Sequence, residues 1–179
     1  MSLGASRVIL SEIYSKDQIK KINNIITEQQ TAPTTGGASN VTKKGTFNFI
    51  HTMDIVNELY GWFNHCQIVN NEYFGYDIKW QYNIDSCIYN EYDVGDEYGW
   101  HVDVMTEQGQ IDSKLTCLLN LSEDPYEGGD FYTVGSNEKW NFDSGCGIIF
   151  NSLLAHKVTP VTKGERTTLT YWGSGPTWR

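Results

Sequence analysis

Apolar residues recur at helical spacing in the first part of the chain. Ser15 is followed three residues later by Gln18, which is a signature of a helix N-terminus. Four isoleucines then share one helical face: Ile19, Ile22, Ile25 and Ile26. A second stripe consists of Met53, Val56, Leu59, Tyr60 and Phe63. The pattern predicts helices over about residues 16–30 and 52–66.

A polar segment separates the two predicted helices. Residues 31–46 contain Pro33 and the Gly36–Gly37 pair and show no apolar periodicity. A long loop of this kind in a compact domain often serves as a lid or binding loop. Its Lys43 and Lys44 would steer an acidic target, although adjacent lysines in a polar loop are usually only solvated.

From about residue 79 onward, short β-prone runs alternate with glycine-centred turns. The runs are Ile78–Tyr82, Ser86–Tyr92, Tyr98–Met105, Lys114–Leu121, Asp130–Val134, Lys139–Phe142, Gly147–Asn151, Ala155–Pro160 and Arg166–Trp172. With helices at the front, the predicted class is α+β: a double-stranded β-helix (jelly roll) with N-terminal helices packed on one sheet. We expect a single domain over residues 1–179, helical over about 1–78 and jelly-roll over about 79–175.

Composition and length are those of one globular domain. The chain has 179 residues, of which 39% are hydrophobic and 13% are aromatic, and this composition excludes a disordered chain. No apolar run is long enough for a membrane helix, and the N-terminus lacks the basic and apolar regions of a signal peptide. We therefore expect no membrane partner and a cytoplasmic location.

The net charge narrows the class of partner. At a formal charge of −9 the protein repels phosphate backbones, and no cluster of Lys and Arg offsets this charge, so we expect no nucleic-acid partner. The four cysteines, Cys66, Cys87, Cys117 and Cys146, lack the spacing of zinc or redox motifs. They are predicted to be reduced structural thiols of a reducing compartment rather than a disulfide framework.

The stretch Tyr98-Gly-Trp-His-Val-Asp103 holds the first candidate for chemistry. On a strand, residues i and i+2 point to the same face, so His101 and Asp103 would project side by side, with Trp100 on the opposite face. One imidazole and one carboxylate at this spacing can hold a cation. The polar outward face of an amphipathic strand gives the same pattern, so these two residues alone do not decide.

Two later features favour a metal site. His156 lies in a run that otherwise indicates buried strand, where a histidine is either a satisfied core residue or a third ligand. Period-2 geometry puts four residues on one face of the last predicted strand: Arg166, Thr168, Thr170 and Trp172. A buried arginine is costly unless it meets an anion, although nearby acidic residues could serve as a structural partner.

Together these residues fit one reaction class. Two histidines and one carboxylate on one face of an octahedral ion leave three positions open, as in non-haem Fe(II) oxygenases. A 2-oxo acid that chelates this iron needs a cation for its far carboxylate, and the guanidinium of Arg166 offers a bidentate fork.

From about Tyr92 to Trp172 the sequence resembles the prolyl 4-hydroxylase-type 2-oxoglutarate/Fe(II) dioxygenases, especially their small bacterial and phage-like members. The stretch Tyr92-Asp-Val-Gly-Asp-Glu-Tyr-Gly-Trp-His-Val-Asp103 matches the family pattern Tyr-x-x-Gly-x-x-Tyr-x-x-His-x-Asp. Residues 114–121, followed by Tyr126-Glu-Gly-Gly, match the core strand and its glycine turn. Residues 147–172 match the segment with the second ligand histidine and the cosubstrate arginine. The first 78 residues carry no matching motif.

The resemblance implies a role for each matched residue. His101, Asp103 and His156 would be the iron ligands, with no catalytic residue beyond the metal centre. Arg166 would form a salt bridge with the distal carboxylate of 2-oxoglutarate, and Tyr92 would hydrogen-bond this cosubstrate.

One position departs from the family pattern. Some members have a tyrosine in the core strand that contacts the distal carboxylate, where the alignment places Leu119. Arg166 would then need other support, from Thr168 or a water, and Thr170 would line the cosubstrate pocket. Three aromatic residues are candidates for the pocket wall, although ordinary core packing explains such residues more often: Tyr98, Trp100 and Trp172.

The implied reaction hydroxylates carbon with O2 and 2-oxoglutarate, forms succinate and CO2, and uses Fe(II), with ascorbate as the expected reductant. The resemblance favours prolyl residues of a peptide or protein, with residues 31–46 and Thr106–Asp112 as candidate substrate lips. One alternative is the same chemistry on a free amino acid, another side chain or a metabolite. A second alternative is a jelly-roll module that binds metal without turnover, and such a module has no use for a cosubstrate arginine.

Overall fold

The computed structural model describes residues 7–29, 34–35, 41–78, 86–103, 106–107, 111–136 and 139–178. The larger of its two sheet layers is antiparallel and forms the centre of the molecule. Within these residues it has eight strands. Their order is β1 (Arg7–Leu10), β10 (Gly147–Asn151), β7 (Ile111–Asn120), β13 (Arg166–Pro176), β4 (Ser86–Tyr92), β3 (Thr46–His51) and β2 (Thr34–Thr35), and β6 (Thr106–Glu107) pairs with β7.

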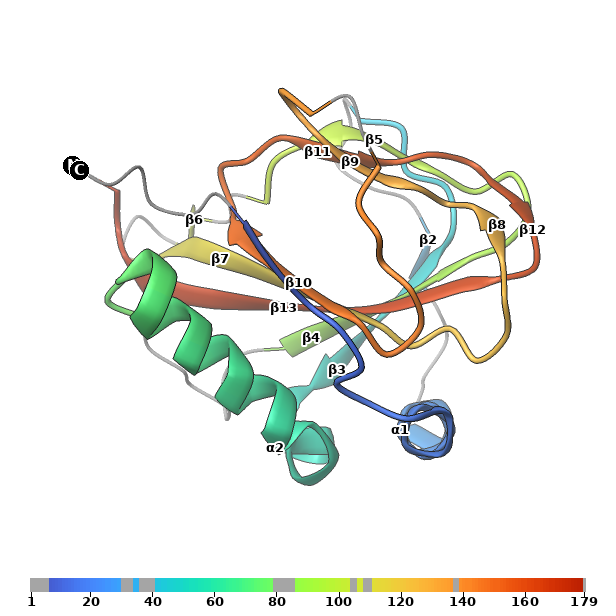
Figure 1. The fold of residues 1–179 in the computed structure, drawn as a ribbon, viewed down its shortest axis with the longest axis horizontal. Helices are drawn as coiled ribbons and strands as arrows, with labels where there is room; N and C mark the ends of the chain where they lie inside the picture. The colour runs from blue at the N-terminus through green and yellow to red at the C-terminus, as the bar shows by residue number, and fades with distance from the viewer. Residues whose placement is uncertain are drawn as a thin grey trace.

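A second layer of short strands faces one side of the larger sheet. It consists of β5 (Tyr98–His101), β11 (His156–Val158) and β9 (Phe131–Thr133), with the pair β12 (Val161–Lys163) and β8 (Glu127–Gly128). Two helices, α1 (Lys16–Gln29) and α2 (Thr52–Val69), lie on the other side of the larger sheet (Figure 1), and one π-helical turn, η1 (Asn70–Phe74), extends α2. The predicted jelly roll with helices on one sheet is confirmed.

Alternation along the central strands divides the interior into two cores. Leu115, Cys117 and Leu119 of β7 point toward the helices, where they meet Trp62 and other apolar residues of α2. The intervening Leu118 joins the core between the two layers. Because successive side chains of a strand point to opposite faces, the same strand serves both cores.

Three of the four cysteines meet in the core under the helices. Cys66 of α2, Cys87 of β4 and Cys117 of β7 belong to this cluster, and the thiols of Cys66 and Cys117 are hydrogen-bonded to each other. Burial raises the pKa of the Cys66 thiol well above its usual value. All four cysteines are buried and reduced, as predicted.

The helix predictions are confirmed, with one error in the second stripe. Helix α1 begins at Lys16, and the side chain of Gln18 accepts a hydrogen bond from the backbone N–H of Ser15 at 2.9 Å. The buried face of α2 consists, in its described part, of Ile55, Leu59, Trp62, Phe63, Cys66 and Val69, and the side chain of the predicted Met53 lies outside the described residues. The predicted Tyr60 is instead 66% exposed, because it lies one residue, and so about 100° of helix rotation, past Leu59.

The prediction of a helical part over about residues 1–78 is wrong in part. This segment supplies β1, β2 and β3, which extend the larger sheet at both of its edges. Strand β1 pairs with β10 and β3 pairs with β4, both far along the chain. A strand that pairs with distant segments depends on them for its structure, and its own residues carry no pattern that predicts the pairing.

The strand predictions differ in their accuracy. Ser86–Tyr92 and Gly147–Asn151 are found as predicted. The stretch Lys139–Phe142 contributes only a single bridge, between Trp140 and Phe131, and the last strand continues to Pro176. Most of the predicted strand Ile78–Tyr82 lies outside the described residues.

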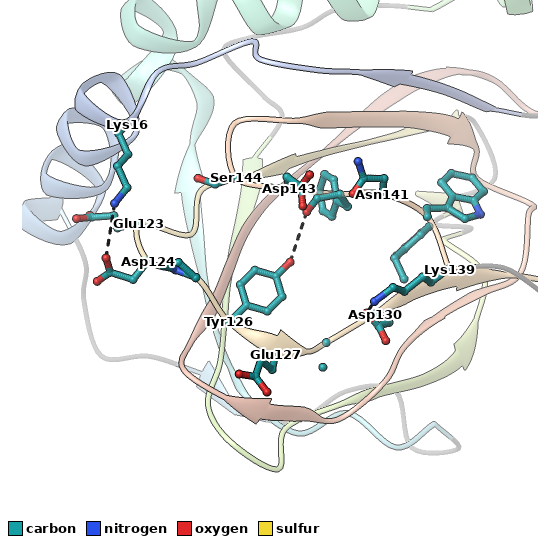
Figure 2. Close-up of a pocket in the computed structure, with 16 residues that line it drawn as sticks. Lys16, Glu123, Asp124, Tyr126, Glu127, Asp130, Lys139, Asn141, Asp143 and Ser144 are labelled. Carbon is teal, nitrogen blue, oxygen red and sulfur yellow. Dashed lines mark hydrogen bonds and ion pairs between the residues drawn. The ribbon is translucent and has the colours of Figure 1, made fainter.

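A hollow of about 500 Å³ opens beside the smaller strands (Figure 2), and no predicted site residue lines it. Five carboxylates line it: Glu123, Asp124, Glu127, Asp130 and Asp143. Lys16 and Lys139 also lie there and form ion pairs with Asp124 and Asp130, at 3.8 and 3.0 Å. In the described part of the chain, no helix is long and apolar enough to cross a membrane.

Replacement of Gly147 by alanine should destabilise the fold. A Cβ at this position would overlap the indole of Trp62 and lie 2.7 Å from Cδ1 of Ile13. Overpacking of this kind typically costs about 1–3 kcal/mol of the free energy of unfolding. Urea denaturation measures the change.

Gly61→Ala is the matched control. The nearest atom to its Cβ would be the Tyr14 hydroxyl oxygen at 3.8 Å, and alanine in a helix interior is favoured over glycine by about 0.5–1 kcal/mol. Equal stability of the Gly147→Ala variant and the unmodified protein would contradict the packing between β10 and α2.

Candidate metal centre and cosubstrate cavity

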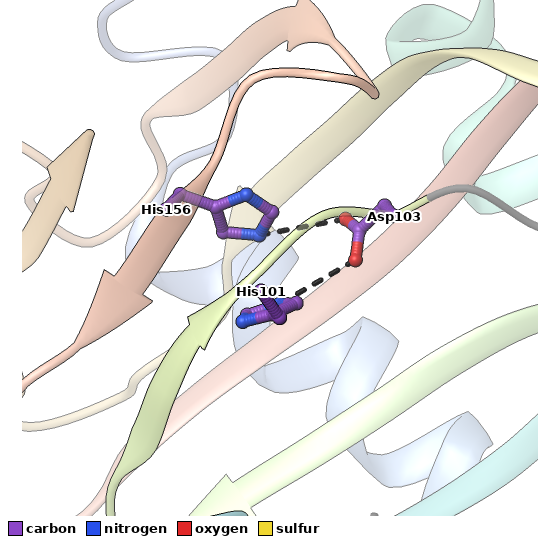
Figure 3. A group of neighbouring side chains, drawn as sticks. All are labelled: His101, Asp103 and His156. Carbon is purple, nitrogen blue, oxygen red and sulfur yellow. Dashed lines mark ion pairs between the residues drawn. The ribbon is translucent and has the colours of Figure 1, made fainter. Parts of the chain in front are cut away.

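Strand pairing brings the two predicted histidines together. In the antiparallel pair of β5 and β11, His101 and His156 are direct partners. Asp103 follows two residues after His101, and its backbone N–H donates to the carbonyl of Ser152 at 3.0 Å. Residues 55 positions apart in the chain therefore face a common point, as Figure 3 shows.

The three side chains present a compact set of donor atoms. Nε2 of His101 lies 3.4 Å from Oδ1 of Asp103, and Nε2 of His156 lies 3.5 Å from Oδ2. All three ligand atoms lie within 4.8 Å of one another. Adjacent ligand atoms around a metal ion at about 2.1 Å are separated by roughly 3 Å, so small adjustments would close the set on one ion.

Hydrogen bonds orient both imidazoles toward this point. Nδ1 of His101 lies 2.8 Å from the carbonyl oxygen of Gly99, and Nδ1 of His156 lies 2.9 Å from that of Leu154. A carbonyl only accepts, so Nδ1 carries the proton and the lone pair of Nε2 is available for a metal. Burial lowers the pKa of His156, which favours the neutral imidazole that binds metal.

The carboxylate is held in its charged form. Thr116 donates to Oδ2 of Asp103 at 3.0 Å. Burial alone would raise the pKa of Asp103, but the adjacent His101 and His156 and the hydrogen bond from Thr116 outweigh it, so this pKa is lowered. Two neutral imidazoles and one carboxylate with open positions form the donor set that suits Fe(II).

A cavity of about 290 Å³ extends from this set between the two layers. Its lining includes nine of the ten predicted site residues: Tyr92, Tyr98, His101, Asp103, His156, Arg166, Thr168, Thr170 and Trp172. The ring of Tyr98 stacks on the imidazole of His101, with centroids 3.5 Å apart. The tenth, Trp100, does not line the cavity and is 49% exposed, with Nζ of Lys157 at 5.0 Å from its ring centroid.

Arg166 is buried in this cavity without an anionic partner. Its side chain is 1% exposed, its Nε has no hydrogen-bond partner, and no carboxylate of the described residues forms an ion pair with it. Its guanidinium lies over the rings of Tyr92 and Phe142, at 5.3 and 5.6 Å from their centroids. A buried charge without a counterion is expensive, so the cavity is built to receive an anion.

Glycine makes room for the arginine. A Cβ on Gly129 would lie 2.7 Å from Cδ of Arg166, and Gly129 has a φ of +59°. Tyr92 is the direct cross-strand partner of Arg166. Burial raises the pKa of the Tyr92 phenol, which keeps its proton available for donation to a ligand.

The structure corrects the placement of Leu119. This side chain is fully buried on the helix-facing side of β7, so it does not face Arg166. The cavity-facing neighbour is Leu118, which also lacks a hydroxyl group. Thr168, next to Arg166 along the same face of β13, lines the cavity, and Thr170 accepts a hydrogen bond from Asn90 at 3.2 Å.

Sequence reasoning missed some lining residues. Ile88 and Asn90 precede Tyr92 at spacing two on β4, so the alternation along this strand could have placed them on the same face as Tyr92. Lys43, which also lines the cavity, lies in the polar segment 31–46, where its neighbours carry no periodicity. Only the folded structure brings it to the site.

Comparison with known proteins agrees with this geometry. Residues 87–174 match the model of the 2OG-Fe(II) oxygenase superfamily. A PKHD-type hydroxylase of Shewanella oneidensis is 34% identical over 91 residues, which cover 48% of this chain and 41% of that protein. The matched stretch thus spans well under half of this relative's length.

Two solved structures share the fold over almost the whole chain. The viral collagen prolyl hydroxylase of Paramecium bursaria Chlorella virus-1, in its 2OG complex, has a TM-score of 0.74 at 15% identity and covers 96% of this chain and 97% of its own. A prolyl hydroxylase of Trichoplax adhaerens, in complex with a hypoxia inducible factor peptide fragment, has a TM-score of 0.72 at 16% identity and covers 94% and 83%. Residues 87–174 therefore belong to the 2OG-Fe(II) oxygenase superfamily, and the chain as a whole has a prolyl 4-hydroxylase-like fold.

Proposed function

We propose that this chain carries the catalytic domain of a 2-oxoglutarate- and Fe(II)-dependent hydroxylase that acts on prolyl residues of a peptide or protein. One observation carries the proposal: a cavity holds both a His-Asp-His donor set and a buried arginine that has no counterion among the described residues. A structural metal site explains the first feature and leaves the second without a purpose. An oxygenase with an anionic cosubstrate needs both.

The residues of the chain divide the work. His101, Asp103 and His156 would hold Fe(II), which when bound supplies O2 activation coupled to decarboxylation of the 2-oxo acid. Arg166 would bind the distal carboxylate of 2-oxoglutarate through two parallel hydrogen bonds, with Tyr92 beside it.

The remaining walls would exclude water. Ile88, Leu118, Phe131 and Val158 give the cavity apolar sides between the metal ligands and the arginine. In a dry site the attraction between guanidinium and carboxylate is stronger than in water. Such walls also protect reactive species from solvent.

The prolyl substrate and the partners are supported by likeness alone. The solved structures named above are prolyl hydroxylases, one of them in complex with a peptide fragment. We therefore propose a peptide or protein substrate, ascorbate as reductant, a cytoplasmic location and no nucleic-acid partner. The four buried thiols support the cytoplasmic location, and the charge of −9 supports the absence of a nucleic-acid partner.

The direct test is incubation with Fe(II), 2-oxoglutarate, ascorbate and proline-rich peptides. We expect succinate and a peptide heavier by one oxygen atom. Succinate with no oxidised peptide would favour a free amino acid or metabolite as substrate. No succinate in any mixture, with metal bound, would favour a non-catalytic metal-binding module.

Arg166→Met should weaken 2-oxoglutarate binding by roughly tenfold to a hundredfold, because hydrogen bonds to a charged group contribute about 1.5–3 kcal/mol. Metal affinity should not change, since the arginine contacts no ligand of the metal set. Calorimetric titration of 2-oxoglutarate measures the effect. Lys163→Met is the control, since Lys163 pairs on the surface with Glu127 at 2.8 Å. Unchanged affinity in Arg166→Met would remove the basis for a cosubstrate.

His101→Ala should abolish iron binding and turnover while the protein stays folded. The imidazole lies on a preformed strand pair, so its loss removes one ligand without removing the scaffold. Metal analysis and circular dichroism check both statements. His65→Ala, on the exposed side of α2, is the control and should retain iron. Global unfolding of the His101→Ala protein would indicate a structural metal instead.

A further inference from the structure

A short segment crosses the smaller sheet at the edge of the cavity. Residues 42–44, here called the strap, run antiparallel to β5. The N–H of Gly99 donates to the carbonyl of Thr42 at 2.8 Å, and the N–H of Lys44 donates to that of Glu97 at 2.9 Å. Lys43 forms the bridge between them, opposite Tyr98. These bonds fix the strap to the strand that carries His101.

The ammonium group of Lys43 lies among aromatic rings and an amide. Its Nζ is 4.3 Å from the ring centroid of Phe47 and 4.8 Å from that of Tyr98, and it donates to Oδ1 of Asn90 at 3.3 Å. No carboxylate of the described residues forms an ion pair with it. Desolvation lowers the pKa of Lys43, and the negative charge of Asp103 offsets only part of this shift.

The neighbouring lysine gives a contrast. Lys44 points away from the cavity and pairs with Glu97, with Nζ 3.0 Å from Oε1. Lys43 lines the cavity, and its hydrogen-bond acceptor there is the neutral amide of Asn90. The two adjacent lysines thus lie in different environments, and of the two only Lys44 forms an ion pair with a described residue.

Lys43 and Arg166 lie at different levels of the cavity. Arg166 is next to Tyr92, whereas Lys43 contacts Asn90, two residues earlier on β4. Phe47 and Phe49 share one face of β3, and Phe49 is 64% exposed, so the Lys43 end lies on the open side. Nζ of Lys43 lies 4.8 Å from the ring centroid of Tyr98, and the imidazole of His101 stacks on the same ring at 3.5 Å, so Lys43 lies one side chain away from a metal ligand.

We propose that Lys43 is a specificity-determining residue that binds a carboxylate of the substrate. This inference rests on the proposed function, in which Arg166 and the metal take the two ends of the dicarboxylate cosubstrate and leave Lys43 for a second anion. Such a substrate has a carboxylate next to the apolar carbon that is hydroxylated. The apolar part fits beside the rings of Phe47 and Tyr98. The carboxylate is either the α-carboxylate of a free amino acid or the side chain of an acidic residue beside the target residue.

The test measures binding rather than turnover. Protein loaded with Mn(II) and 2-oxoglutarate is titrated, without O2, with two matched pairs of probes. L-Proline against L-prolinamide tests the α-carboxylate, and N-acetyl-prolyl-glutamate α-amide, which keeps its γ-carboxylate, against N-acetyl-prolyl-glutamine α-amide tests the side chain. We expect the acid of one pair to bind roughly tenfold or more tightly than its amide. That pair identifies the source of the carboxylate.

Variants assign the preference to the lysine. Lys43→Met should remove the preference for the acid and leave the affinity for 2-oxoglutarate within twofold. Lys43→Glu should reverse it in favour of the amide. Lys44→Met, the matched control, should behave like the unmodified protein, because its ammonium faces Glu97.

Several outcomes overturn the inference. One is equal behaviour of acid and amide in both pairs, including no binding by either member. Another is a large loss of 2-oxoglutarate affinity in Lys43→Met, which would assign the lysine to the cosubstrate. Failure of the proposed function is distinguishable, because it appears first, as absent binding of Mn(II) or 2-oxoglutarate in the same unmodified sample.

Discussion

The antiparallel register between β5 and β11 is the constraint on which the site depends. It makes His101 and His156 direct partners, and a shift of either strand by one residue would turn one imidazole to the opposite face. The register is fixed from outside the site as well. Strand β9 pairs with β11 through His156 and Thr133, and the strap residues 42–44 hold the other edge of β5. Three segments remote in sequence therefore position two nitrogen atoms.

Buried charge is treated in two ways within this one cavity. Asp103 accepts a hydrogen bond from Thr116 and lies beside two imidazoles, so its negative charge is stabilised in the folded protein. Arg166 has aromatic rings beside it, Lys43 has rings and an amide, and neither forms an ion pair with a described residue. Because an uncompensated cation in a dry site is costly, the fold accepts reduced stability where an anionic ligand would restore it. Stability given up at a site of this kind is typical of binding and catalytic regions.

Much of the site could be predicted from the sequence because it lies on long, regularly alternating strands. The period of two put Arg166, Thr168, Thr170 and Trp172 on one face of β13, and all four line the cavity. The same rule explains the error at Leu119. The alignment chose Leu119 in place of its neighbour Leu118, and Leu119 faces the helices rather than the cavity. Trp100 shows a limit of another kind, since alternation says that it faces away from His101 but does not say whether anything covers it.

Features that depend on distant pairing could not be predicted. Strand β1 at one edge and β3 near the other pair with strands far along the chain, so their own residues gave no signal. Lys43 lies in a polar segment, and its position in the cavity follows from backbone bonds to Glu97 and Gly99. A local pattern predicts which face of a strand a residue lies on. The positions of β1, β3 and Lys43 depend instead on long-range pairing between segments.

The cluster of Cys66, Cys87 and Cys117 has a consequence for the oxygen chemistry proposed above. The thiols lie under the helices, while the cavity lies on the opposite side of the larger sheet, so the backbone of β7 and β4 separates sulfur from the metal-ligating residues. Oxidation proceeds through the thiolate, and burial raises the pKa of Cys66 so that the thiolate is scarce. The sheet therefore acts as a shield between the most oxidisable part of the core and the place where an oxidant would be formed.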